Sequence, residues 1–164
     1  MNDSYVECLV ARKKSGIMGL LKAVLLVLTV ILVLMGMVLF PFLIAAVVTG
    51  IGTYFAGMYA SMEFEYLYVD REITVDKILN KTRRKKAEKF EVDRIEILAP
   101  VKSWHLDNYK NREFKVTDYS SGIEGQPDRR YAMIYDGGRK VLLEPSAEFV
   151  KAVQSVAPRK VFFD

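Results

Sequence analysis

The side chains of this chain that are best suited to bind a ligand form a basic cluster between positions 81 and 89. Six cations fall within nine positions, opposed only by Glu88; they are Lys81, Arg83, Arg84, Lys85, Lys86 and Lys89. Close to a membrane, each such charge attracts anionic lipid headgroups by about 1 kcal/mol, and the attraction decays within a Debye length. Three interpretations stay open: contact with anionic lipid, contact with an acidic partner or nucleic acid, and a solvated connection between strands.

The only His and the only Trp of the chain are neighbours, at His105 and Trp104. An imidazole beside Asp107 could move a proton, but no nucleophile motif accompanies the pair. One His without a nearby thiolate cannot complete an ordinary zinc site, and the glycines form neither a P-loop nor a dinucleotide fingerprint. We therefore expect an aromatic turn here, and we predict a non-enzymatic protein with no catalytic residue, cofactor or metal.

A long run of apolar residues precedes the basic cluster, and its structure determines where the cluster lies. Forty consecutive residues, 23–62, contain no charged residue, His, Asn or Gln. A bilayer core takes roughly 20 apolar helical residues per crossing. Pro41 lies near the middle of the run, and proline breaks helices. We predict a transmembrane helical hairpin over residues 17–62 with crossings at 17–39 and 42–62, because one helix of this length would greatly exceed a bilayer.

Basic residues lie on both sides of the apolar run. Arg12, Lys13 and Lys14 precede it, and the cluster that starts at Lys81 follows it. Short segments rich in Lys and Arg stay on the cytoplasmic side of a membrane. The sequence therefore predicts a multi-pass protein of the plasma membrane with both termini in the cytosol, with residues 1–16 as a cytosolic N-terminal segment. A single cysteine, Cys8, fits a reducing compartment.

Small residues recur every three or four positions along the second predicted crossing, which places them on one helical face. They are Ala46, Gly50, Thr53, Gly57 and Ala60. Small residues let helices approach closely in a membrane. Two interpretations stay open: packing against the first crossing of the same chain, and self-association or contact with a partner helix.

Residues 63–164 have the length and patterning of one compact domain. Alternating apolar residues predict six strands, at 64–68, 73–78, 90–97 with a break at 93–94, 116–119, 131–135 and 139–143. Asp136-Gly137-Gly138 gives the strongest hairpin signal. Pro145 suits the start of a helix that Pro158 ends. Nearly balanced charge in this segment is not typical of a nucleic-acid-binding protein.

The stretch FEYLYVDREITVDKILNKTRRKK, Phe64–Lys86, follows the predicted hairpin and precedes the other strands and the last helix. This order resembles an uncharacterised family of small bacterial two-span membrane proteins with a cytosolic pleckstrin-homology-like (PH-like) domain. The resemblance implies a small α+β, mainly β PH-like roll of seven strands closed by a C-terminal helix. It implies no enzymatic activity and carries over no functional residues.

These patterns together favour a membrane-anchored scaffold or interaction module that presents a PH-like domain at the inner leaflet. Its expected partners are the lipid bilayer, anionic lipid headgroups and an unidentified protein, with no nucleic acid. The alternative is an accessory subunit of a transport or envelope-stress complex in which the hairpin is the working part. Intramembrane charges usually mark transport pathways, and the apolar run has none.

Overall fold

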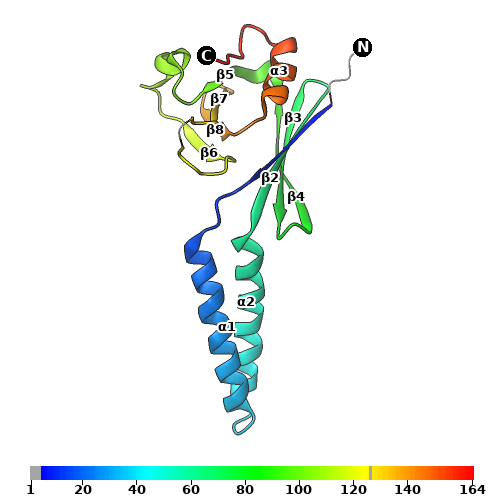
Figure 1. The fold of residues 1–164 in the computed structure, drawn as a ribbon, viewed down its shortest axis with the longest axis vertical. Coiled ribbons are helices and arrows are strands. Elements are labelled where there is room, and N and C mark those ends of the chain that lie inside the picture. Colours follow the sequence, from blue (N-terminus) through cyan, green and yellow to red (C-terminus); the bar gives the residue numbers. More distant parts are fainter. Residues whose placement is uncertain (1–4, 126) are drawn as a thin grey trace. The chain divides into compact units, whose positions relative to one another are not determined.

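The computed structural model describes residues 5–125 and 127–164. The chain forms two compact units, each described here by itself (Figure 1). One unit is a helical hairpin, residues 14–62, together with the short segment 78–83. The other is a β-rich unit that collects residues up to 13, 63–77 and 84–164.

The hairpin consists of α1, Gly16–Gly36, and α2, Pro41–Ala60. With 21 and 20 residues, each helix is about 30 Å long at a rise of about 1.5 Å per residue. Pro41 occupies the first position of α2, where its missing N–H costs nothing. A Cβ on Gly36 would lie 2.9 Å from the backbone nitrogen of Leu43, too close without a shift of the chain, so the turn favours glycine at this position. The predicted pair of apolar helices is confirmed, with ends that differ by one to three residues.

The first sheet of the β-rich unit contains four strands in the order β1-β2-β3-β4. They are β1, Val6–Ala11, β2, Met62–Val69, β3, Glu72–Leu79, and β4, Arg83–Glu91. β1 pairs antiparallel with β2, from Val6 opposite Tyr68 to Ala11 opposite Glu63. The first strand of the sheet therefore precedes the helices, and the second strand follows them.

The second sheet has the order β5-β7-β8-β6. Its strands are β5, Ile95–Pro100, β6, Lys115–Asp118, β7, Tyr131–Tyr135, and β8, Arg139–Leu143. β7 pairs antiparallel with both β5 and β8, while β6 runs parallel to β8. The predicted β7–β8 hairpin is confirmed, and its turn uses positive φ at Asp136 (54°) and Gly137 (72°), as such turns require.

The last helix, α3, Ala147–Val156, packs on the core of the β-rich unit. Ser146 caps its first turn by accepting a hydrogen bond from the Phe149 N–H at 3.2 Å. Phe149, Val150 and Val153 are fully buried, at the helical spacing expected from the sequence. The Phe149 ring packs edge-on against Tyr66 of β2, 6.1 Å between centroids. This architecture agrees with the predicted roll closed by a C-terminal helix, although residues 5–125 and 127–164 contain eight strands where the resemblance implied seven.

The structure differs from the sequence predictions in two strands. β1 lies in residues 1–16, which were expected to be a separate segment, so the domain is not confined to residues 63–164. Its pattern VECLVA is short, and its partner lies more than fifty residues away along the chain. β4 begins within the basic cluster, where four successive cations hide the alternation of a strand. The predicted break at 93–94 is present as a 3₁₀ turn, Val92–Arg94.

Candidate functional site

The basic cluster occupies the β3–β4 turn and the strand that follows it. Asn80 and Lys81 have φ values of 50° and 56° and form a tight turn. The Asn80 N–H donates a hydrogen bond of 2.8 Å to the Ser61 carbonyl, directly after α2. Residues 78–83 accordingly belong to the same compact unit as the helices. The turn that carries Lys81 and Arg83 is thus fixed at the end of the hairpin where the chain leaves α2.

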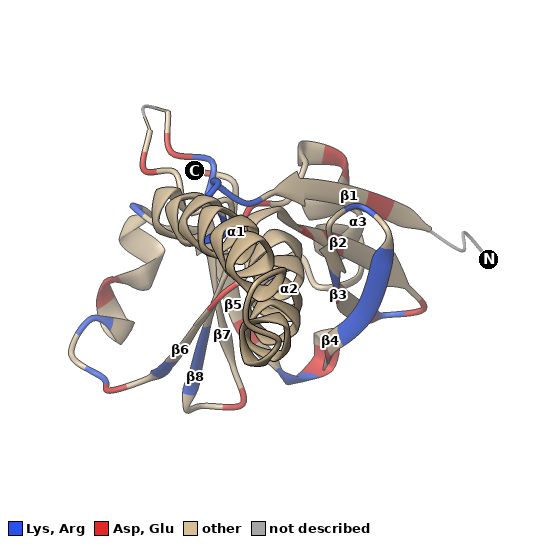
Figure 2. Ribbon diagram, turned by 90° about the horizontal axis from the view of Figure 1, so that it is seen from below, with Lys and Arg blue, Asp and Glu red and all other residues tan. Residues whose placement is uncertain are grey.

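The six cations of the cluster fall into two groups. Arg84 lies 2.6 Å from the Glu65 carboxylate, and Lys89 lies 2.5 Å from that of Glu72. The other four are exposed and, within residues 5–125 and 127–164, have no carboxylate oxygen within 4 Å; they are Lys81, Arg83, Lys85 and Lys86. β4 is accordingly the most strongly basic strand in Figure 2. The surface offered to an anion therefore contains four of the six predicted residues.

The Arg84 side chain pairs with a buried carboxylate, that of Glu65. The residue is 3% exposed, although it lies on the opposite side of β2 from the core residues Phe64 and Tyr66. Burial, followed by a hydrogen bond with Glu7, raises the pKa of the Glu65 carboxyl. The same hydrogen bond lowers the pKa of Glu7. Removing Arg84 would leave a buried carboxyl with no cation, a costly arrangement, so Arg84 acts as a structural partner.

The small-residue face of α2 is turned toward α1. A Cβ on Gly50 would lie 3.7 Å from Cγ2 of Thr29, and one on Gly57 would lie 3.4 Å from Cε of Lys22. No member of the predicted stripe is exposed; the members are Ala46, Gly50, Thr53, Gly57 and Ala60. Two of its positions therefore face α1 of the same chain at van der Waals distance.

A hydrogen bond joins the two helices beside this face. The Thr29 hydroxyl of α1 lies 3.0 Å from the Thr49 hydroxyl of α2. The Thr29 hydroxyl also donates to the Leu25 carbonyl at 2.7 Å, and the Thr53 hydroxyl donates to the Thr49 carbonyl at 2.9 Å within α2. Hydroxyls in an apolar setting need such partners. The hydroxyls of Thr29, Thr49 and Thr53 thus all have hydrogen-bond partners within the hairpin.

A model of the family described as "Bacterial PH-like domain (DUF6106)" matches residues 2–163. The chain belongs to this family. The match begins ahead of β1, so the family includes both the strand before the helices and the hairpin itself. No curated protein and no solved structure matches the chain. The predicted resemblance to a bacterial PH-like family is confirmed.

A polar link that the sequence did not indicate joins the two sheets of the PH-like domain. Glu88 of β4 accepts hydrogen bonds from Arg139 of β8, at 2.9 Å from Nη2, and from the Tyr119 hydroxyl, at 3.0 Å. Arg139, above all, lowers the pKa of Glu88. Burial, reinforced by Glu88, raises the pKa of Tyr119 to about 12. These residues are 51 and 31 positions from Glu88, too far for a spacing pattern to reveal.

His105 lies in an aromatic stack of the PH-like domain. Its ring is 3.8 Å from the centroids of both Trp104 and Phe162. The carboxylate nearest to its Nε2 is that of Asp164, at 3.4 Å, whereas Asp107 lies 2.6 Å from Lys110. Within the described residues, no three His, Cys, Asp or Glu side chains come together as metal ligands. The geometry of this turn is that of a packed aromatic element capped by Ser103.

Proposed function

We propose that this bacterial PH-like protein is a membrane-anchored, non-enzymatic interaction module. In this proposal α1 and α2 cross the plasma membrane and hold the PH-like domain at the inner leaflet, with both termini in the cytosol. The exposed cations of the β3–β4 turn contact anionic headgroups, and the domain recruits a protein partner as a scaffold.

The exposed surface of the hairpin supports membrane insertion. Large apolar side chains point outward along both helices and at their connection, with Ile17 of α1 at 78% exposure, Val38 of the connection at 84% and Ile44 of α2 at 62%. Soluble proteins rarely leave apolar patches of this extent uncovered. Both helices also have the length of one bilayer crossing. An apolar surface of this kind is suited to contact with the acyl chains of lipid.

The place of the hairpin in the chain is the observation that carries the proposal. The chain leaves the β-rich unit after β1 and returns to it in β2, and Ala11 and Glu63 are directly paired. Two strands of one folded sheet cannot lie on opposite sides of a membrane. An even number of crossings between them is therefore required, and two helices provide it. This constraint supports a common side of the membrane for β1 and for the rest of the domain, and the basic residues on both flanks of the hairpin favour the cytosol as that side.

The β3–β4 turn supports contact with anionic lipid. It is bonded to Ser61, the residue that follows α2, so it lies where the proposed hairpin leaves the membrane. The exposed cations of the turn, Lys81 and Arg83, and those that follow in β4, Lys85 and Lys86, would each attract anionic headgroups by about 1 kcal/mol near the surface. Arg84 and Lys89 are engaged with carboxylates and provide internal controls.

Cysteine labelling tests the topology. In a Cys8→Ser background, Val38→Cys places a thiol between the helices and Arg159→Cys places one on the PH-like domain. A membrane-impermeant maleimide should label Val38→Cys only in right-side-out vesicles and Arg159→Cys only in inside-out vesicles. Labelling of both from the same side would mean that the helices do not cross the membrane.

Hydrogen exchange tests the lipid contact, and it requires the full chain because residues 63–164 alone lack β1. In nanodiscs, amides 80–86 should exchange more slowly with phosphatidylglycerol present than in pure phosphatidylcholine. Raising the salt should remove the difference, because the attraction is screened. Arg83→Gln with Lys85→Gln should also remove it, whereas Lys89→Gln should retain it. Equal exchange in the two lipids would refute contact between the turn and anionic lipid.

A further inference from the structure

One cation lies within the helical hairpin itself. Lys22 belongs to α1 and is exposed, six positions after the first residue of the helix, Gly16. Between Ser15 and Met62 it is the only Lys, Arg, Asp or Glu of the sequence. A charged side chain in a helix of this kind is costly in a membrane, so it usually has a partner and a function. The surroundings of the Lys22 ammonium therefore indicate what this residue binds.

The Lys22 side chain lies across Gly57 of α2. A Cβ on Gly57 would lie 3.4 Å from Cε, 3.6 Å from Cδ and 3.6 Å from Nζ of Lys22. The outer part of the lysine side chain thus occupies a notch between the helices that is open because Gly57 has no side chain. Gly57 belongs to the small-residue face, but the group packed on it is a lysine side chain and its ammonium.

The ammonium lies near the end of the hairpin at which α1 begins and α2 ends. Gly57 precedes the last residue of α2, Ala60, by three positions, which is about 4.5 Å along the axis at about 1.5 Å per residue. Tyr59 stands at the same end and is 53% exposed, and tyrosines gather at the level of lipid headgroups. Side chains in a helix lean toward its N-terminus, so the stem of Lys22 leads toward this level.

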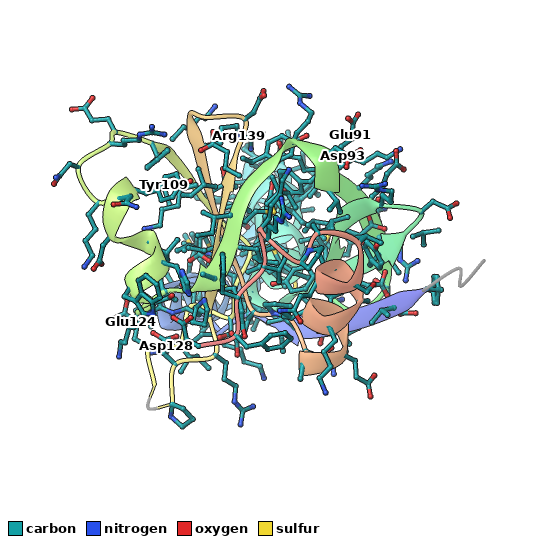
Figure 3. All side chains as sticks on the ribbon, turned by 90° about the horizontal axis from the view of Figure 1, so that it is seen from above. Glu91, Asp93, Tyr109, Glu124, Asp128 and Arg139 are labelled. Carbon is teal, nitrogen blue, oxygen red and sulfur yellow. The ribbon has the colours of Figure 1, made fainter. Side chains whose placement is uncertain are left out.

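The hairpin supplies no anion for this ammonium. Within residues 5–125 and 127–164, no carboxylate oxygen lies within 4 Å of Lys22 Nζ. The four carboxylates labelled in Figure 3 all belong to the β-rich unit; they are Glu91, Asp93, Glu124 and Asp128. An anion that pairs with Lys22 therefore comes from outside the part of the chain that the structure describes.

We propose that the Lys22 ammonium binds the phosphate of an anionic phospholipid, whose acyl chains lie along the exposed apolar side chains of the hairpin. Lysine binds phosphate as a compact point charge, and lipid phosphates are the anions present at this depth of a membrane. Gly57 leaves the notch open for the lysine stem. The inference rests on the proposed membrane anchoring, and it adds a lipid site between the helices to the contact at the β3–β4 turn.

Native mass spectrometry of the full chain in an uncharged detergent counts the bound lipid molecules. We expect phosphatidylglycerol to bind at least threefold more tightly than phosphatidylcholine. Glycerol 3-phosphate carries a phosphate without acyl chains and should not displace the bound lipid at equal concentration. Equal binding of the two lipids, or displacement by glycerol 3-phosphate, would overturn the proposal. The measurement needs no bilayer, so its failure leaves the labelling of Val38→Cys unchanged and can be told apart from a failure of membrane anchoring.

Three variants test the lysine itself. Lys22→Met keeps an unbranched stem over Gly57 but removes the charge, and it should weaken phosphatidylglycerol binding at least fivefold. Lys22→Arg keeps the charge and should stay within twofold of the original chain. Lys14→Met removes the same charge from an exposed residue ahead of α1 and should alter binding less than twofold. Unchanged binding in Lys22→Met, or equal losses in Lys22→Met and Lys14→Met, would refute a lipid site at Lys22.

A combined variant separates this site from the β3–β4 turn. In a chain that carries Arg83→Gln with Lys85→Gln, Lys22→Met should still weaken phosphatidylglycerol binding at least fivefold, because independent sites contribute additively. The absence of a further loss would place the lipid at the turn and overturn the proposal.

Two glycines of α2 test the notch. Gly57→Val fills the space beside the Lys22 stem and should weaken phosphatidylglycerol binding at least threefold. Gly52→Val is the matched control, because a Cβ on Gly52 would lie 3.7 Å from the apolar Cδ1 of Leu25, and it should alter binding less than twofold. Equal losses in the two variants would mean that any larger residue between the helices disturbs binding, and the role of the notch would be refuted.

Discussion

The helical hairpin and the PH-like domain arrange the same kinds of side chain in opposite ways. In the domain, Phe64, Ile73 and Phe149 have no exposed surface. In the hairpin, Ile17 and Val38 are mostly exposed, at 78% and 84%, while threonine hydroxyls meet between the helices. One chain thus contains a unit with an apolar interior and a unit with an apolar exterior.

The contrast implies different stabilising forces in the two units. Burial of apolar surface from water stabilises the domain by about 25 cal/mol per Å². If α1 and α2 lie in lipid as proposed, that term is absent between them, and close packing and hydrogen bonds between hydroxyls hold the hairpin together. The same type of substitution should therefore change the free energy of unfolding by different amounts in the two units.

The largest expected difference in the loss of unfolding free energy is between the substitutions of two phenylalanines, one in each unit. Phe149→Ala should lower the unfolding free energy of the domain by about 3–5 kcal/mol, because it leaves a cavity in the core. Phe55→Ala removes the same ring from α2, where the residue is 49% exposed, and should cost less than about 1 kcal/mol. Chemical unfolding in detergent, followed by near-ultraviolet circular dichroism, measures both. Similar losses would contradict an apolar exterior for the hairpin.

The next largest expected loss of stability follows removal of a buried polar group, the Tyr66 hydroxyl, from the core of the domain. The buried Tyr66 hydroxyl donates to the Tyr119 carbonyl and accepts from the Glu144 N–H at 3.2 Å. Tyr66→Phe leaves both backbone groups without their partner and should cost about 1–3 kcal/mol. Burial raises the pKa of Tyr66 well above its ordinary value, so the hydroxyl stays protonated and able to donate.

Tyr68→Phe is the matched control for this change. Tyr68 is buried to a similar degree, at 2% exposure, and its hydroxyl forms no hydrogen bond within the described residues. Its removal should leave the unfolding midpoint nearly unchanged. Equal destabilisation by the two variants would mean that the Tyr66 bonds contribute nothing.

Features with a local periodicity were predictable from the sequence, and those that depend on distant pairing were not. The hairpin was evident because forty residues share one property and Pro41 interrupts them. Strand β1 was missed because its identity as a strand depends on β2, on the other side of the helices. The sequence also could not show which cations of the basic cluster form ion pairs. Glu65 and Glu72 approach Arg84 and Lys89 only in the folded sheet.

A smaller effect should appear as a pH dependence confined to the domain. The pKa of Glu88 is lowered in the folded state by Arg139, so its ion pair stabilises the fold above the ordinary pKa of about 4.5. That stability is lost as the pH falls through the lowered value. Glu88→Gln should cost about 1 kcal/mol at pH 7 and reduce the slope of stability against pH below about 4.5. An unchanged acid slope in urea unfolding would rule out this contribution.

The smallest expected effect lies in the hairpin. Thr29→Val keeps the shape of the side chain but removes the hydroxyl that meets Thr49 across the helices. Such bonds in membrane proteins contribute about 0.6 kcal/mol on average, because the separated helices also find partners. Thr53→Val is the control, since among the described residues the Thr53 hydroxyl bonds to the carbonyl of Thr49 in its own helix and to no group of α1. Thermal unfolding in detergent should place Thr29→Val below Thr53→Val by a small margin, with the size of the particle unchanged. A loss of several kcal/mol for Thr29→Val would instead mean that the hydroxyl is buried as in a water-soluble core, and the contrast between the two units would be wrong.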